Sequence, residues 1–302
     1  MDKKVVIIGA GRVSYSLASA LSKSGYNIIS IHSRDINSAR ELAKKFRVSQ
    51  FSNELNNISK SARIFFLSVP DSQISIVSSK LSKQNLNFKQ SLFVHLSGAV
   101  NISVLDALKR RHAKIASLHP MQTFPSKKIV NLKGVHAALE TQDEGAFKLL
   151  LQICRDLQLV PFRVDSKNKS YYHLAGVYVS NFLAGNLYIA DKLLSLNKIE
   201  TEKHFDILHS TIISTIKNIE KVGPANALSG PVERGDLQTI KNHISSLKKL
   251  RKKRLSNYHS TILKNYLIQS LGLIDLVKDK KGGLDNSHRK IEEMLVQELN
   301  SL

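Results

Sequence analysis

The chain of 302 residues has a single cysteine, Cys154, and no long hydrophobic run. One cysteine cannot form an intrachain disulfide, which excludes a disulfide-stapled secreted fold and fits a reducing compartment. No apolar stretch approaches the roughly 18 residues that a membrane-spanning helix needs. The first apolar run, Val5–Ile8, is too short for the hydrophobic segment of a secretory signal. We therefore expect a cytoplasmic protein with no membrane association, and the sequence predicts no metal site.

Acidic residues are scarce, with 24 Asp and Glu against 45 Lys and Arg and a net charge of +21. The excess is spread along the chain, because residues 1–164 carry 24 basic and 10 acidic residues and residues 165–302 carry 21 and 14. The densest basic run, residues 248–254, contains no aromatic residue, so the stacking platform of single-strand binders is missing. We expect this run to be a solvated helix face. A small anionic substrate, rather than nucleic acid, is the partner that we expect the positive charge to attract.

Up to residue 164 short β-branched runs alternate with helical patterns, which predicts an α/β fold with a parallel, doubly wound sheet. The predicted strands are Val5–Ile8, Tyr26–His32, Ile64–Val69, Ser91–Leu96, Lys114–Ser117, Val135–Leu139 and Val160–Val164. The predicted helices are Val13–Ser24, Ile36–Phe46, one that starts at Pro70-Asp71, Val104–Arg111 and Glu144–Leu157.

After Asp165 a period of 3.6 residues dominates, which predicts an all-helical second domain over residues 165–302. The predicted helices are Tyr171–Leu196, Glu202–Lys221, Asp236–Lys249 and Tyr258–Val277, with one more after Gly282-Gly283. Gly223-Pro224 and Ser229-Gly230-Pro231 punctuate them. Two domains, residues 1–164 and 165–302, also agree with a prior of roughly 150 residues per domain.

The segment Gly9-Ala10-Gly11-Arg12-Val13 joins the first predicted strand to the first predicted helix. At such a junction the first glycine permits a tight turn, and the second lets the backbone approach a pyrophosphate at the helix N-terminus. Ser14 stands where a third glycine is usual, and it is small enough to keep helix and strand close. The placement predicts a dinucleotide site that includes Gly9, Gly11, Arg12 and Val13.

The second predicted strand ends in His32-Ser33-Arg34 and lacks the Asp or Glu that binds the ribose hydroxyl of NAD. Ser33 can donate a hydrogen bond to a 2′-phosphate, and Arg34 can pair with that phosphate or stack on adenine. This favours NADP(H) over NAD. The alternative is that Asp35 caps the next helix while Arg34 is simply an exposed side chain.

Three segments leave predicted strands at the carboxyl edge of the sheet, where ligands of open α/β sheets bind. They are Val69-Pro70-Asp71, His95–Ala99 and Ser117–Phe124. We expect Val69 and Pro70 to contact the cofactor, and Ser97 and His119 to contact the nicotinamide or the substrate. The alternative for His119 is a turn residue beside a proline, and His95 is expected to be structural.

In the helical domain His173, Val177 and Asn181 follow one another at a spacing of four residues, which places them along one helix face. The functional interpretation is that His173 delivers a proton while Asn181 orients the substrate oxygen. The alternative is a core histidine and a solvent-facing asparagine. In the loop that follows, Arg234 is suited to a substrate carboxylate. Asp236 either contributes to that substrate site or caps the next helix.

Taken in order, these motifs resemble the bacterial proteins that join a Rossmann-like domain to a DUF2520 domain, relatives of the 6-phosphogluconate dehydrogenase-like reductases. The motifs are Gly9–Val13, Ser33-Arg34, Val69–Asp71, Ser97–Ala99, His119–Phe124, Tyr172-His173, Ser180-Asn181 and Gly230–Asp236. The resemblance implies a Rossmann domain followed by a helical substrate and dimerisation domain, a nicotinamide cofactor and a homodimer.

Some members of that family are similar to an alternative class of ketopantoate reductase, an enzyme of pantothenate synthesis. The usual ketopantoate reductases open their helical domain with Lys-x-x-x-Asn-x-x-x-Asn. On that frame this chain retains only the last asparagine, as Asn181, and has His173 in place of the lysine. A histidine can serve as the acid because its ordinary pKa, about 6.5, lies near neutrality.

The leading hypothesis is therefore an oxidoreductase, an NADPH-dependent reductase of a small 2-oxo acid, with ketopantoate as the best single substrate. His173 or His119 would supply the proton, Asn181 and Ser97 would position the oxygen, and Arg234 would hold the carboxylate. An imine reductase or a prephenate-type dehydrogenase on the same architecture is the second interpretation. A non-catalytic NADP-sensing binding protein is the third, because fold alone does not fix function.

Overall fold

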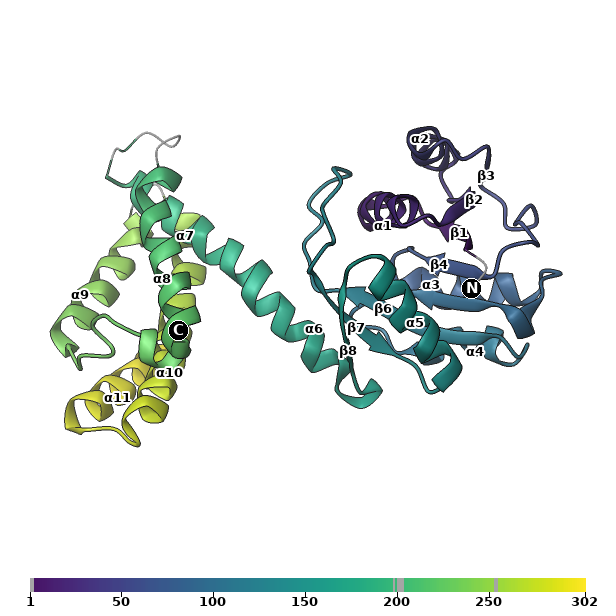
Figure 1. Cartoon of the computed structure of the whole chain (residues 1–302). Helices are drawn as coiled ribbons and strands as arrows, with labels where there is room; N and C mark the ends of the chain where they lie inside the picture. Colours follow the sequence, from purple (N-terminus) through teal and green to yellow (C-terminus); the bar gives the residue numbers. More distant parts are fainter. Residues whose placement is uncertain (1–2, 198, 200–203, 253–254) are drawn as a thin grey trace. The chain divides into compact units, whose positions relative to one another are not determined.

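An eight-stranded sheet organises the first part of the chain in the computed structural model (Figure 1). The structure describes residues 3–197, 199, 204–252 and 255–302. It forms two units, Met1–Phe182 around the sheet and Leu183–Leu302 built from helices. We refer to them as the sheet unit and the helical unit.

The strands of the sheet unit lie in the order β3-β2-β1-β4-β5-β6-β7-β8. Their bounds are β1 Lys4–Ile8, β2 Asn27–His32, β3 Gln50–Ser52, β4 Ile64–Leu67, β5 Leu92–His95, β6 Lys114–Pro120, β7 His136–Glu140 and β8 Val160–Arg163. The pairs within β1 to β6 are parallel, which confirms an α/β, doubly wound sheet. The short edge strand β3 was not predicted from the sequence.

The far end of the sheet departs from the prediction of a wholly parallel arrangement. β7 pairs antiparallel with β6, and β8 is parallel to β7. The reason is the connection between β6 and β7, residues 121–135, which contains no helix. Adjacent parallel strands need a crossover connection, usually a helix, whereas a loop that turns back yields an antiparallel neighbour.

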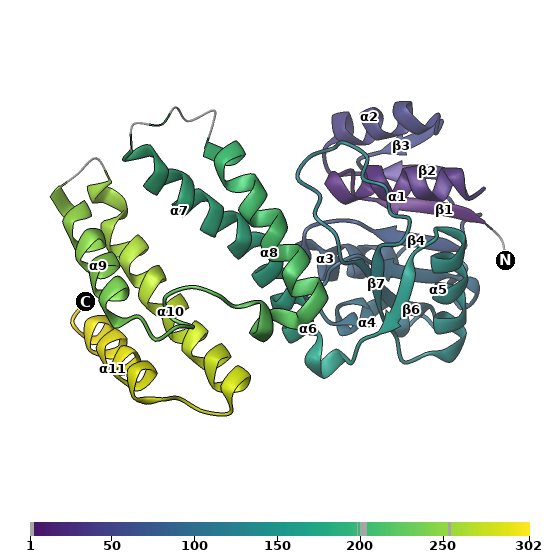
Figure 2. The same ribbon diagram turned by 60° about the vertical axis from the view of Figure 1, so that its left-hand side comes forward.

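Helices cover both faces of this sheet (Figure 2). Their bounds are α1 Arg12–Lys23, α2 Ile36–Phe46, α3 Asp71–Ser82, α4 Asp106–Lys109 and α5 Glu144–Asp156, with 3-10 turns η1 Phe88–Gln90, η2 Ile102–Leu105 and η3 Ser166–Asn168. Val5 and Ile7 of β1 pack with α1, α2 and α5, whereas Val6 and Ile8 pack with α3 and α4. Because successive strand residues face opposite sides, the unbroken apolar run in β1 reflects a strand that is covered on both faces.

The strands of the parallel part end at one common edge. In the register, Ile8 pairs with both His32 and Leu67, Leu67 pairs with His95, and His95 pairs with Ser117. The loops that follow these residues therefore leave the sheet side by side. This edge is where the sequence analysis placed the ligand.

The first helical segment after the sheet belongs to the sheet unit. The sequence predicts a first domain that ends at residue 164, whereas this unit extends to Phe182. The difference arises because α6 (Lys169–Val177) packs on the sheet unit: Lys169 bonds Glu140 of β7, and Tyr172 bonds His119 of β6. A π-helical turn, η4 (Tyr178–Phe182), follows α6 without interruption.

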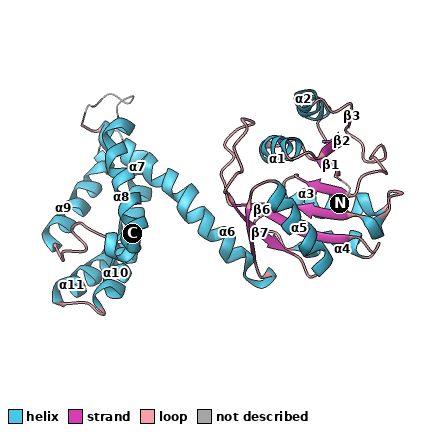
Figure 3. Cartoon of the chain, in the orientation of Figure 1, coloured by secondary structure: helices cyan, strands magenta, loops and turns pink. Residues whose placement is uncertain are grey.

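The described residues of the helical unit contain no strand, which confirms an all-helical C-terminal region (Figure 3). The helices are α7 Leu183–Ser195, α8 His204–Ala227, α9 Leu237–Lys248, α10 His259–Lys281 and α11 Asn286–Asn300, with 3-10 turns η6 Lys249–Lys252 and η7 Ser256–Tyr258. The core of the unit is formed mainly by α9, α10 and α11, and α8 contributes no residue to it. A kink at Gly223, with φ of 78°, interrupts α8 before Pro224.

Two predictions extend beyond the described residues. The helix predicted from Glu202 starts in a segment, residues 200–203, that lies outside them, and the described helix begins at His204. In the basic run 248–254, residues 253 and 254 also lie outside them. None of the described helices is long and apolar enough to cross a membrane.

Candidate functional site

The turn between β1 and α1 has a geometry that only glycine can adopt. Gly9 has φ of 108°, and a Cβ at this position would lie 2.0 Å from the carbonyl oxygen of Ser68. The Gly9 N–H donates to the His32 carbonyl at 2.6 Å. Ser14, in place of a third glycine, is buried, and its Oγ lies 2.8 Å from both Gly9 O and Ser68 Oγ. The serine therefore ties the turn to the end of β4.

The start of α1 offers free backbone donors to a ligand. Gly11 is the N-cap residue, without a side-chain cap, and the first turn carries no acidic residue. A Cβ on Gly11 would meet no atom within 4 Å, so the space beside it is open. Unpaired N–H groups and the positive end of a helix dipole suit a phosphate. These residues thus fit the pyrophosphate of a dinucleotide.

A cavity of about 710 Å³ opens beside this turn, and we call it the glycine-turn cleft. Of the predicted cofactor residues, Gly9, Gly11, Ser33, Arg34, Val69 and Pro70 line it, whereas Arg12 and Val13 do not. Further lining comes from His32, Asp35, residues 53–56 and, on α3, Gln73, Ile76, Val77 and Lys80, with Lys83 just beyond. The sequence analysis missed these α3 residues because they belong to an amphipathic helix with no motif of its own.

The two charged residues that follow β2, Arg34 and Asp35, have different surroundings. Asp35 caps α2 by accepting hydrogen bonds from the Ser38 hydroxyl (2.6 Å) and from the N–H groups of Asn37 (3.0 Å) and Ser38 (3.2 Å), and these bonds lower its pKa. Arg34 is exposed, lines the cleft and pairs with no other described residue. Asp35 is thus used as the helix cap that the alternative interpretation foresaw. Arg34 remains available to a ligand.

The loop after β5 is held by its own side chains. Ser97 is 8% exposed, and its Oγ accepts hydrogen bonds from the N–H groups of Ala99 (3.2 Å) and Val100 (3.0 Å). The Ser97 N–H donates to Nδ1 of the buried His95 at 3.2 Å, and burial lowers the His95 pKa to about 3. His95 is therefore neutral and structural. Ser97 retains a hydroxyl proton, but its oxygen already shapes the loop.

His119 is the centre of a cluster that joins β5, β6 and α6. A Cβ on Gly98 would lie 2.7 to 2.9 Å from three atoms of the His119 ring, so the ring occupies the space that glycine leaves. His119 Nδ1 is 2.8 Å from the Tyr172 hydroxyl, and the His173 ring centroid lies 6.2 Å away. Two of the predicted catalytic residues, His119 and His173, are thus brought together.

The electrostatics of this cluster favour a neutral imidazole. Burial, with smaller contributions from the charges of His173 and Lys169, lowers the His119 pKa to about 4. Burial also raises the pKa of Tyr172 to about 12. Near neutral pH, His119 is therefore uncharged and Tyr172 keeps its proton.

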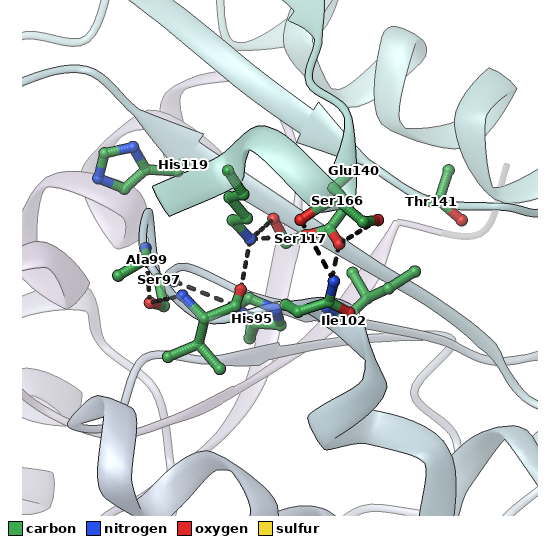
Figure 4. A network of polar contacts seen from close by, with 12 residues as sticks. His95, Ser97, Ala99, Ile102, Ser117, His119, Glu140, Thr141 and Ser166 are labelled. Atoms are coloured by element: carbon green, nitrogen blue, oxygen red, sulfur yellow. Dashed lines mark hydrogen bonds and ion pairs between the residues drawn. The ribbon is translucent and has the colours of Figure 1, made fainter. Parts of the chain in front are cut away.

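A buried ion pair fixes this cluster in place (Figure 4). Lys169 and Glu140 have side chains 1% and 2% exposed. The Lys169 ammonium donates to the Val100 carbonyl (2.6 Å), Ser117 Oγ (2.7 Å) and Glu140 Oε2 (2.7 Å). The other Glu140 oxygen accepts from the Ile102 N–H (3.2 Å) and Ser166 Oγ (2.7 Å). Every polar group of the pair is satisfied, and burial lowers the Lys169 pKa.

Asn181 lies on the π-helical turn η4 and is exposed. In a regular α-helix, residues eight apart differ in direction by about 80°, and residues seven apart by about 20°. A π turn accommodates one extra residue. The π turn therefore changes the direction of Asn181 relative to His173 from the one that a regular helix would give.

Arg234 and Asp236 belong to the helical unit. Asp236 caps α9, accepting from the Thr239 N–H (3.0 Å) and hydroxyl (2.7 Å), so its carboxylate is used within the protein. Hydrogen bonding lowers its pKa. Glu233 pairs with Lys280 at 2.9 Å, whereas the side chain of Arg234 is exposed and makes no hydrogen bond or ion pair with a described residue. Its charge acts on the nearby carboxylates of Glu233 and Asp236, which already have other partners.

Comparison with known proteins agrees with this class of fold, a Rossmann-like domain followed by helices. A Rossmann-like domain matches residues 2–120, and a domain of unknown function, DUF2520, matches residues 135–264. The chain therefore joins a Rossmann-like domain to a DUF2520 domain, as the sequence motifs implied. Curated proteins include no match to it.

Solved structures extend the comparison over nearly the full length. A candidate NADP oxidoreductase from Bacteroides fragilis is 25% identical with a TM-score of 0.74, over 90% of this chain and 98% of that chain. A protein from Thermotoga maritima is 23% identical with a TM-score of 0.68, over 92% and 99%. A pyrroline-5-carboxylate reductase from Coxiella burnetii shares the fold at 17% identity and a TM-score of 0.54, over 89% and 97%.

The described residues contain no group of three or more His, Cys, Asp or Glu side chains arranged to hold a metal ion. At the carboxyl edge of the sheet lie the open helix N-terminus beside Gly11, the exposed Arg34 and the uncharged His119. This set suits an organic cofactor and an anionic ligand.

Replacement of Lys169 by Met should destabilise the sheet unit. It leaves the Glu140 carboxylate buried without its cation, and loss of one partner of a buried pair costs about 3 to 5 kcal/mol. The free energy of unfolding can be measured by urea denaturation followed by circular dichroism. The double variant Lys169→Met/Glu140→Met should recover part of the loss, and Lys167→Met, at an exposed lysine of the same segment, is the control. A Lys169→Met protein as stable as the control would contradict the assignment.

Proposed function

We propose that the protein is an NADP(H)-dependent oxidoreductase that reduces a small anionic substrate, with a 2-oxo acid, ketopantoate first, as the substrate. The observation that carries this proposal is the glycine-turn cleft. It combines an uncapped helix N-terminus, a free Arg34 and an Asp35 that is already used as a cap. The similarity to a candidate NADP oxidoreductase supports the same cofactor.

The phosphates and the 2′-phosphate would be held by different parts of the cleft. The N–H groups at the start of α1, beside Gly11, suit the pyrophosphate. Ser33 and Arg34 suit the 2′-phosphate, with Lys80 of α3 as a second cation along the same cleft. Val69 and Pro70 line the cleft at the end of β4 and would contact the cofactor there. The cofactor, when bound, supplies the hydride.

The protein's own contribution would be to orient and polarise the substrate. His119 would donate a hydrogen bond to the oxygen that becomes the alcohol, since its ring is uncharged near neutrality. His173, beside it, would supply the proton. Asn181 would orient the same oxygen, and Ser97 would position the substrate through its hydroxyl proton. Arg234 would hold the carboxylate, because a guanidinium binds carboxylates in a bidentate manner.

An imine is the second candidate substrate. The fold is shared with a pyrroline-5-carboxylate reductase, which acts on a cyclic imine that also carries a carboxylate. The same hydride donor and the same cationic anchor would serve either substrate. A fold similarity at 17% identity does not distinguish a 2-oxo acid from an imine as the substrate. The two substrates therefore have to be compared directly.

Purified protein should oxidise NADPH when ketopantoate is added, and more slowly or not at all with NADH. The measurement is the change in nicotinamide absorbance: a loss with NADPH and ketopantoate or pyrroline-5-carboxylate, and a gain with NADP⁺ and prephenate. Turnover of the imine alone would move the assignment to the second candidate. If no substrate is turned over although NADPH raises the melting temperature, the protein is an NADP-sensing binding protein instead.

Replacement of Arg34 by Asp should reverse the cofactor preference. The variant puts a negative charge where the 2′-phosphate is expected, and loss of a charge-assisted hydrogen bond costs about 1.5 to 3 kcal/mol, roughly tenfold or more in affinity. The dissociation constants of NADPH and NADH can be measured by titration calorimetry. Arg110→Asp, at an exposed arginine outside the cleft, makes the same charge change. If the two variants lost the same affinity for NADPH, Arg34 would have no specific role in binding the 2′-phosphate.

A homodimer formed through α8 is a further part of this proposal. Six large apolar residues of this helix are 38 to 57% exposed: Phe205, Ile207, Ile213, Ile216, Ile219 and Val222. A helix is stabilised mainly by packing of its apolar face, and α8 gives none of its side chains to the core of its own unit. Residues 207–216 carry no Asp, Glu, Lys or Arg in a chain of net charge +21. Two copies can therefore meet along residues 207–216, which include Ile207, Ile213 and Ile216, without bringing like charges together.

Replacement of Ile213 and Ile216 by Glu should convert the dimer to a monomer. Two carboxylates would have to be buried in the interface of each subunit, which costs several kcal/mol per ion. Sedimentation equilibrium at micromolar concentration measures the mass. Ile268→Glu, at a residue of α10 that is 57% exposed, is the control. A monomeric wild-type protein would exclude the second copy as the cover of α8.

A further inference from the structure

Tyr172 is in direct contact with the histidine at the centre of the site, although no motif singled it out for a role. Its hydroxyl lies 2.8 Å from His119 Nδ1, and the two rings meet edge to face with centroids 5.6 Å apart. Among the described residues the hydroxyl has no other hydrogen-bond partner. The contact links the second turn of α6 to the end of β6.

The direction of this hydrogen bond follows from the chemistry of the two groups. A phenol is a better donor than a neutral imidazole N–H, and the imine nitrogen of imidazole is a better acceptor than a phenol oxygen. If His119 Nδ1 carried the proton instead, the Tyr172 O–H would need another acceptor, and a half-buried donor without one is costly. The phenol therefore donates to Nδ1, and the remaining ring proton sits on Nε2.

We propose that Tyr172 is a positioning residue that acts through His119, holding the ring uncharged in the tautomer whose N–H is on Nε2. The inference deepens the proposed function and rests on it in one respect, because there the Nε2–H is the group that polarises the substrate oxygen or nitrogen. A neutral imidazole can serve as such an electrophile. Tyr172 itself would not touch the substrate.

The residues that surround His119 favour an uncharged ring. The Gly98 backbone lies against the ring from the β5 loop, and His95 of β5 is neutral. From α6 come His173 and the cationic Lys169, which oppose a positive charge on the ring. Described residues place no carboxylate against His119 that would favour the imidazolium. Tyr172 thus adds the one hydrogen bond that selects between two neutral tautomers.

The variant Tyr172→Phe isolates the hydroxyl from the ring. The aromatic ring also packs edge to face on Phe162, with centroids 5.6 Å apart, and phenylalanine keeps that contact. Tyr171→Phe makes the same chemical change one residue earlier, at a side chain that is 71% exposed. The pair of variants separates loss of the hydrogen bond from loss of a tyrosine hydroxyl in general.

The first readout is the state of the His119 ring, which does not depend on turnover. In protein labelled with ¹⁵N at histidine, two-bond proton correlations distinguish the Nε2–H tautomer from the Nδ1–H tautomer, and a His119→Gln protein identifies the resonances. Wild-type protein and Tyr171→Phe should show the Nε2–H tautomer. Tyr172→Phe should show a mixture, with a His119 pKa higher than in the wild type, because a hydrogen bond to the neutral form disfavours the charged one.

The second readout is kinetic. With the substrate that the panel identifies, Tyr172→Phe should lower kcat about fivefold, the effect of one ordinary hydrogen bond, and change KM by less than about twofold. An Nδ1–H tautomer in the wild type, or a ring unchanged in Tyr172→Phe, would overturn the inference even if kcat fell. If wild-type protein binds NADPH but turns over no substrate, the proposed function fails, while the ring measurement still decides the role of Tyr172.

Discussion

The buried ion pair of Lys169 and Glu140 is the interaction on which the site depends. A lone buried charge costs several kcal/mol, so the pair is stable only because each of its polar groups has a partner. Those partners come from distant parts of the chain: the loop after β5, strand β6, strand β7 and the turn before α6. The Lys169 and Glu140 charges can all be hydrogen-bonded only if these segments come together in one arrangement. The pair specifies geometry, whatever its net contribution to stability.

The chemistry of the cluster follows from that arrangement. Lys169 stands three residues before Tyr172 and four before His173, so anchoring its ammonium under the sheet edge sets the position of the first turn of α6. His119 follows Ser117, the hydroxyl that this ammonium binds, by two residues of β6. His119 and Tyr172 thus meet because one cation holds both strand and helix. Burial, with smaller contributions from His173 and from the same cation, keeps the His119 ring uncharged.

Much of the fold could be predicted from local sequence patterns. The features that depend on contacts between residues far apart in the sequence could not. The glycine turn and the residues after β2 were placed correctly because strand, turn and helix lie within about 30 residues of sequence, as in a βαβ unit. Helix α2 was predicted with its observed bounds, since an N-cap aspartate and a clear helical period delimit it. The reversal at β7 had no local signal. Lys169 lies in a polar segment, residues 165–170, for which the sequence predicted no role, and its burial depends on Glu140, 29 positions earlier. Tyr172 was noticed in a motif, but its partner His119 lies 53 positions away.

The excess of positive charge affects both the sheet unit and the helical unit. A net charge of +21 opposes association of the chain with itself, and residues 207–216 of α8 carry no Asp, Glu, Lys or Arg, which suits them to the proposed contact between two copies. Among the described residues, Arg34 and Lys80 along the glycine-turn cleft and Arg234 on its loop form no ion pair, and these are the cations that the proposed function assigns to an anionic ligand. Glu233, next to Arg234, forms an ion pair with Lys280, and Asp35, next to Arg34, caps helix α2. In both places the neighbouring carboxylate is occupied, so the guanidinium keeps its charge for a ligand.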